Sequence, residues 1–436
     1  MENLRLYNRY RAATRQAASA PRVVEGTPRE LARLVRRTVR EVDGKVWLVA
    51  DRNTAAAAPE IVEALGPNHQ TLLPGTPTVV PHIEIAEQIA RDAGAAGTRV
   101  MVVIGGGTLT DLAKYAALQA DAMLLSVPSA ASVDAYNSAR SALRIEGYHR
   151  TPDARVPAAI LASPAIIESA PEALSLAGLG DLVAKLLARL DWHVSALVTG
   201  EAFSLRETEW SARAARHALA RLRHAGLEEA AYAGLDALLV TGRAMRVFGS
   251  SRPAASSEHT VAHLWEVALE GDEEHYHGLL VAEAARHVVR AYRWILGRLE
   301  GLQAKSTLEL NPWPREAEAS WESRLPDDMK PFAGKMREES AGRTLSDETA
   351  ARHRERILSE RGFILSLGRQ ILDDAERGLD TLAAAGLTAY LPEVPHHWVG
   401  RALQWVKYLR NRYSLFDVAF ELGWEDELLE YMEAAR

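Results

Sequence analysis

The sequence contains no cysteine, and this absence removes several kinds of chemistry at once. Disulfides, thiolate metal ligands and a cysteine nucleophile are all excluded, so any metal ion must be bound by imidazole nitrogen and carboxylate oxygen. The chain also lacks a net positive charge, because 51 Lys and Arg stand against 58 Asp and Glu. A formal net charge of −7 argues against a dedicated nucleic-acid or anionic-membrane partner and leaves a small anionic substrate possible.

Long apolar runs are missing as well. Apolar stretches such as 100–104 and 279–282 are far shorter than the roughly 20 residues that a membrane-spanning helix needs. We therefore expect a soluble protein without membrane insertion. The first forty residues are rich in Arg and poor in acids, as in a transit peptide, but they lack Ser enrichment and show helical spacing at Leu31, Leu34 and Val35. We interpret them as a folded N-terminal segment of a cytoplasmic protein.

The chain has enough apolar residues for two hydrophobic cores. Its 436 residues are 47% hydrophobic, and a single core stops growing at about 250–300 residues. In the first third, short apolar runs bounded by Gly, Asp or Pro alternate with helical patterns that begin at Pro. The pattern predicts strands at 45–50, 99–104 and 122–127 and helices at 28–42 and 81–93. This alternation is typical of an α/β domain with a parallel sheet.

The composition changes after residue 164. Leu, Ala, Arg and Glu recur at helical spacing through 171–196, 210–223 and 235–247, without a convincing strand. We predict an α/β domain at 1–166 and a mostly helical domain at 167–436. The segment 308–348 is rich in Pro, Trp and charge, which indicates a loop-rich insertion or a helical pair with a long connection. A solvated excursion without a catalytic role is the interpretation that we favour for it.

A glycine run follows one predicted strand directly. Gly105, Gly106 and Gly107 are followed by Thr108, Leu109 and an amphipathic helix. Backbone N–H groups at such a turn can approach a pyrophosphate at the helix N-terminus, where the helix dipole favours negative charge. The run lacks G-x-G-x-x-G spacing, so a plain tight turn remains the alternative. Its place at the carboxyl end of a parallel strand, however, is where open α/β sheets bind cofactors.

Two carboxylates lie near other predicted strand ends. Asp51 follows the 45–50 strand, where it either contacts an adenosine ribose or caps a helix together with Asn53 and Thr54. We give the two interpretations equal weight. Asp134 is the only carboxylate in 128–138, a loop whose small hydroxyl residues suit contact with a cofactor. It is a candidate substrate or ribose contact, and a surface turn stabilised by Asp134 and Asn137 is the alternative.

Histidines cluster later in the chain. Of the 14 histidines, four fall within 259–277: His259, His263, His275 and His277. Because His259 and His263 are four residues apart, they share one face of a helix. A metal would need a further hard ligand, and the sequence GLGDLVAK offers Asp181, which we expect in the first turn of an apolar helix. Ordinary helix capping by Asp181 and structural histidines are the alternatives.

Several motifs, taken in order, resemble the bacterial and archaeal sn-glycerol-1-phosphate dehydrogenases. They are GGGTLTDLAK, SVPSAASVDAYNS, AGLGDLVAK, DWHVSALVTGE, SSRPAASSEHTVAHLWE and YHGLLVA, and they span about 51–277. The C-terminal YLRNRYSLFDVAFELG is also similar to that family. The wider group contains glycerol dehydrogenase, iron-type alcohol dehydrogenases and 3-dehydroquinate synthase. The resemblance implies a dehydroquinate synthase-like fold, in which an N-terminal dinucleotide-binding α/β domain and a helical metal-bearing domain enclose the active site.

The resemblance also implies roles for particular residues. Asp181, His259 and His277 would be the metal ligands, Asp134 and His263 would contact substrate, and His275 matches no ligand position. NAD or NADP would contact the following residues: Asp51, Gly105, Gly106, Gly107, Thr108, Leu109, Ser129, Ala130, Ala131, Ser132 and Ser138. Many members of the family have Thr in place of Ser129 and Gly in place of Ala135, and both departures are mild. The segment 308–348 has no counterpart that we can place.

The activity implied is a metal-dependent, NAD(P)-linked sn-glycerol-1-phosphate dehydrogenase that interconverts dihydroxyacetone phosphate and sn-glycerol-1-phosphate for phospholipid biosynthesis. A homo-oligomer is implied too. Imidazole and carboxylate ligands suit zinc or nickel, and they accept iron. NAD has a slight preference over NADP, since Asp51 would repel a 2′-phosphate. Lys185 and Arg252 are candidate phosphate ligands, although a structural or surface role is the favoured interpretation of each.

Other functions stay open at this point. A glycerol-dehydrogenase-like polyol oxidoreductase would use the same metal and cofactor chemistry on an unphosphorylated substrate. A 3-dehydroquinate synthase-like cyclase is less well supported, because that branch typically carries Glu where this chain has Asp181. A non-catalytic ligand-binding protein with the same fold is the alternative from a different class.

Overall fold

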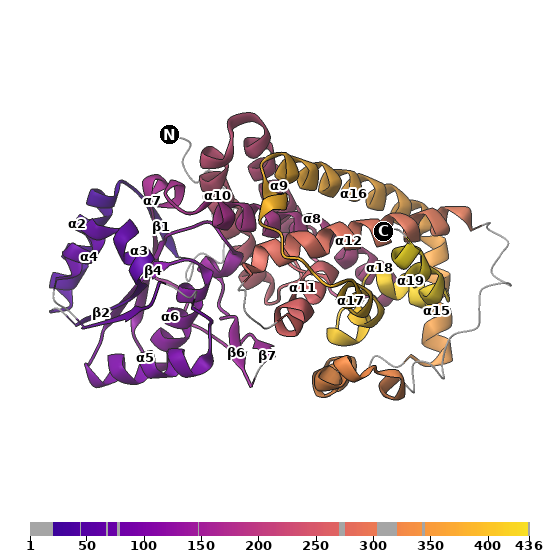
Figure 1. Ribbon diagram of the computed structural model, residues 1–436, viewed down its shortest axis with the longest axis horizontal. Helices are drawn as coiled ribbons and strands as arrows, with labels where there is room; N and C mark the ends of the chain where they lie inside the picture. The colour runs from indigo at the N-terminus through magenta and orange to yellow at the C-terminus, as the bar shows by residue number, and fades with distance from the viewer. Residues whose placement is uncertain are drawn as a thin grey trace.

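The computed structural model describes residues 21–43, 45–66, 69–75, 79–146, 148–269, 275–302, 321–341 and 345–434. An α/β part and a helical part lie side by side (Figure 1). Residues 1–20, half of the segment that we expected to be a folded N-terminus, lie outside the described residues. Among the described helices, none is long and apolar enough to cross a membrane.

The α/β part is built on a six-stranded sheet in which all neighbouring strands run parallel. In the order in which they pair, the strands are β1 (Arg22–Glu25), β8 (Ala159–Ala162), β5 (Met123–Pro128), β4 (Val100–Gly105), β2 (Val46–Asp51) and β3 (His69–Leu73). The three predicted strands are confirmed as β2, β4 and β5. The edge strands β1 and β3 and the inner strand β8 were missed because four or five residues give too little periodicity.

Helices cover both faces of the sheet, so this part has three layers (Figure 1). Side chains along β2 alternate, with Val46 and Leu48 packing in one core and Trp47 and Val49 in the other. The covering helices are α2 (Pro28–Glu41) and α4 (Pro59–Leu65) on one face and α5 (Ile83–Ala95) and α6 (Gly107–Gln119) on the other. The predicted helices at 28–42 and 81–93 correspond to α2 and α5. Two short strands, β6 (Leu143–Ile145) and β7 (Tyr148–Arg150), form a separate antiparallel pair.

The described chain beyond β8 is helical and contains no further strand, as predicted. Its longer helices are α8 (Glu172–Thr199), α9 (Leu205–Ala225), α10 (Leu227–Phe248), α11 (Ser257–Ala268), α12 (His277–Gly301), α15 (Asp347–Ser359), α16 (Arg361–Ala384) and α17 (His396–Leu409). The shorter ones are α7 (Pro164–Glu168), α14 (Ala333–Ser340), α18 (Leu415–Glu421) and α19 (Glu425–Ala434). The change from alternating to helical structure occurs at α7, and the domain boundary between 166 and 167 stays a prediction.

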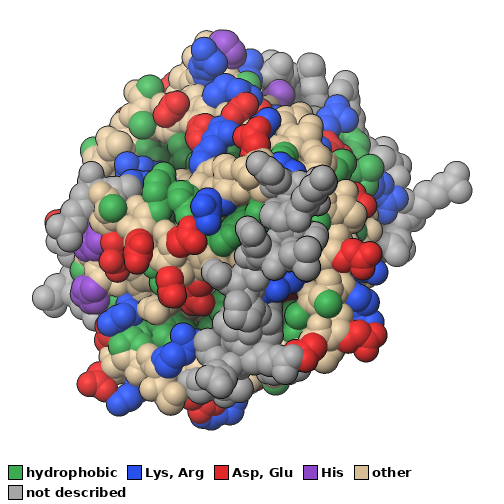
Figure 2. Space-filling model, turned by 90° about the vertical axis from the view of Figure 1, so that its right-hand side faces the viewer, with side chains coloured by type: hydrophobic (Ala, Val, Ile, Leu, Met, Phe, Trp, Pro, Cys, Tyr) green, Lys and Arg blue, Asp and Glu red, His purple; other side chains and the backbone are tan. Residues whose placement is uncertain are grey.

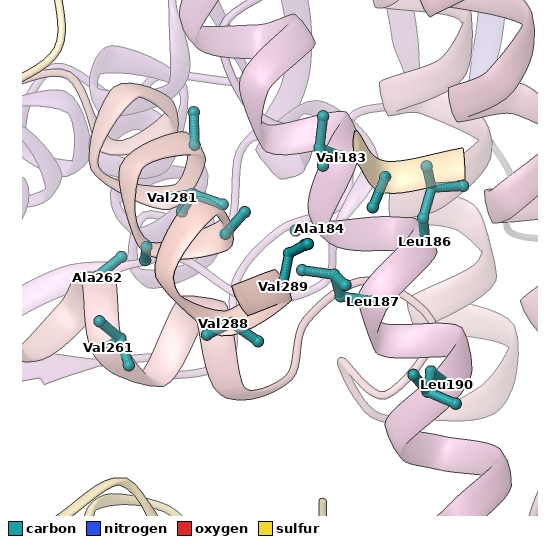
Figure 3. Close-up of a cluster of buried hydrophobic side chains, with 14 of the residues drawn as sticks. Val183, Ala184, Leu186, Leu187, Leu190, Val261, Ala262, Val281, Val288 and Val289 are labelled. Carbon is teal, nitrogen blue, oxygen red and sulfur yellow. The ribbon is translucent and has the colours of Figure 1, made fainter. Parts of the chain in front are cut away.

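Helix α8 is the central element of this part and packs against α9, α10, α12 and α16. Figure 3 shows Val183 and Leu187 of α8 beside Val281 and Val288 of α12, all fully buried. Burial of such aliphatic side chains stabilises the fold by about 1.5–3 kcal/mol each. At the outer end of the helical part, acidic and basic side chains are interspersed over the visible face, without a large patch of one charge (Figure 2).

The segment 308–348 differs from our expectation. Its residues 308–320 and 342–344 lie outside the described part of the chain, but 321–341 fold into short helices packed on α17. Trp321 stacks on Tyr408 with ring centroids 5.2 Å apart, and Met329, Phe332 and Met336 are buried. The favoured interpretation of a solvated excursion is wrong for these residues, because apolar side chains spaced three and four apart lie between the charged ones and face α17.

Candidate functional site

A cavity of about 1610 Å³ lies between the sheet and the helical part. The carboxyl ends of β2, β4 and β5 contribute one wall, with Asp51, Gly106 and Ser132 among its residues. The opposite wall includes His259 of α11 and His277 of α12. One cavity therefore joins the glycine turn to the histidine cluster.

Three candidate metal ligands from three helices meet beside this cavity, and two of them, His259 and His277, line it. Asp181 of α8, His259 of α11 and His277 of α12 each offer a ligand atom, and these atoms lie within 4.8 Å of one another. Asp181 Oδ1 is 3.1 Å from His259 Nε2, whereas Asp181 Oδ2 is buried without a hydrogen-bond partner. A buried carboxylate oxygen without a partner is costly, and a cation beside it would remove that cost. The three residues therefore fit a divalent metal ion.

Close approach of two helix backbones brings these ligands together. A Cβ atom on Gly278 would lie 2.0 Å from the carbonyl oxygen of Ala177, and one on Gly180 would lie 2.8 Å from the carbonyl oxygen of Gly278. Only glycine fits at such a crossing. Asp181 is the tenth residue of α8, which begins at Glu172, so both its predicted place in a first helical turn and the capping alternative are wrong. The glycines before Asp181 mark a helix crossing rather than a helix start.

Two glutamates that the sequence interpretation missed hold the imidazoles. Glu266 Oε1 lies 2.5 Å from His277 Nδ1 and its Oε2 lies 2.8 Å from His263 Nδ1. Glu258 Oε1 lies 3.0 Å from His259 Nδ1. Carboxylates behind metal-binding histidines fix ring orientation and tautomer. Burial alone would lower the pKa of His277, but Glu266 and Asp181 raise it to about 9. The sequence carried a signal for both glutamates, because Glu258 directly precedes His259 and Glu266 follows His263 by three residues.

Asp134 and Lys185 complete the polar centre. Lys185 Nζ is fully buried, 2.9 Å from Asp181 Oδ1 and 2.8 Å from Asp134 Oδ2. Burial opposes its charge, but the two carboxylates outweigh burial and raise the pKa of Lys185. Burial likewise opposes ionisation of Asp181, yet Lys185, His259 and His277 hold the pKa of that carboxyl below its usual range. Asp134 therefore belongs to the site and not to a surface turn, and Lys185 is held by carboxylates.

The glycine turn has the form that the sequence predicts. Gly106 precedes α6 with extended backbone and no side chain caps the helix, so backbone N–H groups at its N-terminus are left for a ligand. A Cβ atom on Gly107 would lie 2.3 Å from Val133 Cγ2, which explains the glycine there. Around the turn, the cavity wall includes these predicted cofactor residues: Gly106, Gly107, Thr108, Leu109, Ser129, Ser132 and Ser138.

Other predicted positions fall elsewhere. Gly105, Ala130 and Ala131 are buried and do not line the cavity. Asp51 does line it and also caps α3 (Arg52–Ala57), since Thr54 N donates to Asp51 Oδ1 at 2.7 Å. The capping interpretation of Asp51 is confirmed, and its ribose contact stays a prediction.

Arg252, a candidate phosphate ligand, is buried away from the cavity wall. Its Nε donates to Glu201 Oε1 at 2.7 Å. The structural interpretation of Arg252 is confirmed. His263 and His275 both line the cavity, and the ring of His263 stacks on that of His277 at a centroid distance of 5.1 Å.

Sequence comparison identifies relatives of this chain. The family model described as iron-containing alcohol dehydrogenase matches residues 22–171. Glycerol-1-phosphate dehydrogenase [NAD(P)+] of Bacillus subtilis (strain 168) is 32% identical over 237 residues, which cover 52% of this chain and 58% of that protein. The protein of the same name from Hyperthermus butylicus is 36% identical over 197 residues, covering 44% and 56%. Over these stretches the chain is similar to the glycerol-1-phosphate dehydrogenases. It spans little more than half the length of these two.

Solved structures agree on the fold. An iron-containing alcohol dehydrogenase from Corynebacterium glutamicum superimposes with a TM-score of 0.57 at 15% identity, covering 96% of this chain and 95% of that one. Sulfoacetaldehyde reductase from Bifidobacterium kashiwanohense, solved in complex with NAD+, gives a TM-score of 0.55 at 12% identity, covering 96% and 98%. The α/β part followed by a helical part is therefore the iron-type alcohol dehydrogenase fold, as the resemblance implied.

Proposed function

We propose that this chain is a metal-dependent, NAD(P)-linked dehydrogenase that interconverts dihydroxyacetone phosphate and sn-glycerol-1-phosphate. The observation that carries the proposal is the meeting of Asp181, His259 and His277, because the two histidines line a cavity that also reaches the glycine turn of a parallel sheet. The substrate comes from the relatives, which bear the name glycerol-1-phosphate dehydrogenase [NAD(P)+].

The chain's own residues suit hydride transfer to a ketone. A divalent metal held by Asp181, His259 and His277 supplies Lewis-acid polarisation of a carbonyl group. The N-terminus of α6 would hold the pyrophosphate of the dinucleotide through backbone N–H groups, and Ser132 lies on the same cavity wall. Asp134, fixed by Lys185, and His263, oriented by Glu266, line the cavity where substrate oxygens would lie. His263 then positions or protonates a substrate oxygen.

Several finer properties belong to the same proposal. The metal is zinc or nickel, with iron also compatible with this ligand set. NAD is preferred over NADP because the carboxylate of Asp51 on the wall would repel a 2′-phosphate. By the resemblance we further propose a cytoplasmic homo-oligomer that serves phospholipid biosynthesis.

The test is a spectrophotometric assay of dihydroxyacetone phosphate reduction with NADH and NADPH, together with metal analysis of the same preparation. We expect metal in the purified protein and a strong preference for dihydroxyacetone phosphate over dihydroxyacetone. His259→Ala should lose both metal and turnover, whereas His275→Ala, on the same cavity wall without a ligand position, should keep the metal.

Two results would overturn the proposal in different ways. Equal turnover of the phosphorylated and free substrates would favour the polyol oxidoreductase. A wild-type protein that contains no metal and oxidises no NADH would favour the non-catalytic ligand-binding protein.

A further inference from the structure

A group of cations lies on the cavity wall outside the metal-binding triad. Lys335 comes from α14, and Arg410 and Arg412 come from the segment that follows α17. Lys335 therefore belongs to the packed part of 308–348, for which the sequence suggested no role in the site. Lys335 lies far from the two arginines in the sequence, and the fold brings all three side chains to one wall.

Two guanidinium groups converge on one hydroxyl group. Arg410 Nη2 donates to Ser251 Oγ at 3.1 Å, and Arg412 donates to the same oxygen and to the carbonyl oxygen of Ala255. Burial, together with Arg410 and Arg252, lowers the pKa of Arg412. Within the described residues, no carboxylate forms an ion pair with Arg412. Two like charges held this close are most stable when an anion lies between them.

Lys335 also differs from its cationic neighbours. Arg140 and Arg150 line the same cavity, but Arg140 pairs with Asp153 and Arg150 with Glu338, each at 3.1 Å. Lys335, by contrast, forms no hydrogen bond or ion pair with any residue of the described ranges. Burial is the main reason why the pKa of Lys335 is lowered; the charge of Glu339, on the same wall, opposes this shift, and Arg410 and Arg150 add to it. A half-buried ammonium group without a partner is available to a ligand.

The cations lie near the metal-binding triad at the two ends of α11. At the start of α11, Ala255 accepts a hydrogen bond from Arg412 and directly precedes the N-cap of the helix. Glu258, which is hydrogen-bonded to His259, acts electrostatically on Arg410 and Arg412. At the other end of α11, Glu266 contacts His277 and acts electrostatically on Lys335. In a three-carbon substrate the phosphate is only a few bonds from the carbonyl group, so its subsite must border the metal.

We propose that Lys335, Arg410 and Arg412 form the subsite that binds the phosphate of the substrate and so select phosphorylated over free triose. The assignment of a phosphorylated triose rests on the proposed function above. Guanidinium groups recognise phosphate by paired N–H donors, and the ammonium group adds a point charge.

The experiment compares Lys335→Gln with Lys330→Gln. Lys330 is a matched control, since it lies in the same segment, is 65% exposed and, among the described residues, pairs only with the exposed Asp327. Loss of one charge-assisted contact is worth about 10-fold to 100-fold. We expect Lys335→Gln to raise the KM for dihydroxyacetone phosphate by about that factor while turnover of free dihydroxyacetone is unchanged, and Lys330→Gln to alter neither.

The variants Arg412→Lys and Arg412→Gln provide a second test of the phosphate subsite. The Lys variant keeps the charge but loses the paired donors, so we expect a smaller rise in KM than with Gln. Circular dichroism and metal content of each variant distinguish loss of phosphate binding from misfolding. A KM for dihydroxyacetone phosphate that is unchanged in Lys335→Gln and in Arg412→Gln would overturn the subsite.

Inorganic phosphate separates failure of the subsite from failure of the proposed function. Calorimetric titration of the wild-type protein with phosphate should show binding that Lys335→Gln weakens and Lys330→Gln does not. If the wild-type protein fails to reduce dihydroxyacetone phosphate but binds phosphate in this way, the anion site stands and the proposed function falls. If it reduces dihydroxyacetone phosphate while neither KM nor phosphate binding depends on Lys335 or Arg412, the function stands and the subsite falls.

Discussion

Gly178→Ala should force helix α8 away from the loop at Ala131, whereas Gly234→Ala should not. Both glycines are buried in helices and both lie near Ala131, so they form a matched pair. A Cβ atom on Gly178 would lie 1.6 Å from the carbonyl oxygen of Ala131. The nearest atom to a Cβ on Gly234 would be Leu179 Cδ2 at 3.5 Å, an ordinary van der Waals contact. One added methyl group is thus a severe clash at the first site and harmless at the second.

The size of the effect follows from the distance. Contacts of a Cβ below 3.0 Å essentially do not occur, so α8 and the loop at Ala131 must move apart by at least 1.4 Å, the difference between 3.0 and 1.6 Å. Overpacking of a buried site costs about 1–3 kcal/mol, and a clash with backbone belongs at the upper end, about 3 kcal/mol. Gly234→Ala should instead stabilise the protein by about 0.5–1 kcal/mol through helix propensity.

Urea denaturation followed by circular dichroism measures both free energies of unfolding. Because α8 carries Asp181 and Ala131 lies in the loop after β5, the same shift should weaken dinucleotide binding, measured by nucleotide fluorescence titration. Equal denaturation midpoints for Gly178→Ala and Gly234→Ala would refute the reasoning.

Three further predictions concern other parts of the structure. Burial raises the pKa of Asp191 to about 6. The contribution of this group to the free energy of unfolding is therefore complete below pH 4 and falls by about 3 kcal/mol as pH rises through 6. In urea titrations from pH 4 to pH 7, the free energy of unfolding of the wild type should fall by this amount relative to that of Asp191→Asn. Glu266→Gln should weaken metal binding about 10-fold to 100-fold in a chelator competition assay, and an unchanged affinity would show that Glu266 does not orient His277. Trp321→Ala should cost about 3–5 kcal/mol in unfolding free energy, and a loss below 1 kcal/mol would mean that 321–341 packs loosely.

The sequence predicted the parts of the fold that depend on local pattern. Strands β2, β4 and β5 were recognisable because each is short and mostly apolar, with five or six consecutive residues buried in a parallel sheet that is covered on both faces. The outer strand β1 reads RVVE, which no periodicity distinguishes from a loop. Secondary structure in the helical part was predictable for the same reason, since α8, α9 and α10 repeat apolar residues over several turns.

The sequence predicted which residues form the site but not how they are arranged in space. The family resemblance selected Asp181, His259 and His277, and the fold brings their ligand atoms together. The place of Asp181 deep inside α8 was not predictable, because Gly178 and Gly180 are needed for contacts with segments distant in sequence. No local signal marks Lys335 as a residue of the cavity wall. Its position depends on how 321–341 packs against α17.

The central claim is that Asp181, His259 and His277 bind one metal ion on which reduction of dihydroxyacetone phosphate depends. The most direct measurement is a titration of metal-stripped protein with zinc or nickel while NADH oxidation by dihydroxyacetone phosphate is followed. We predict that activity rises in proportion to added metal and reaches a plateau at about one equivalent per chain, and that His259→Ala shows no rise. Full activity in the stripped protein would contradict the claim.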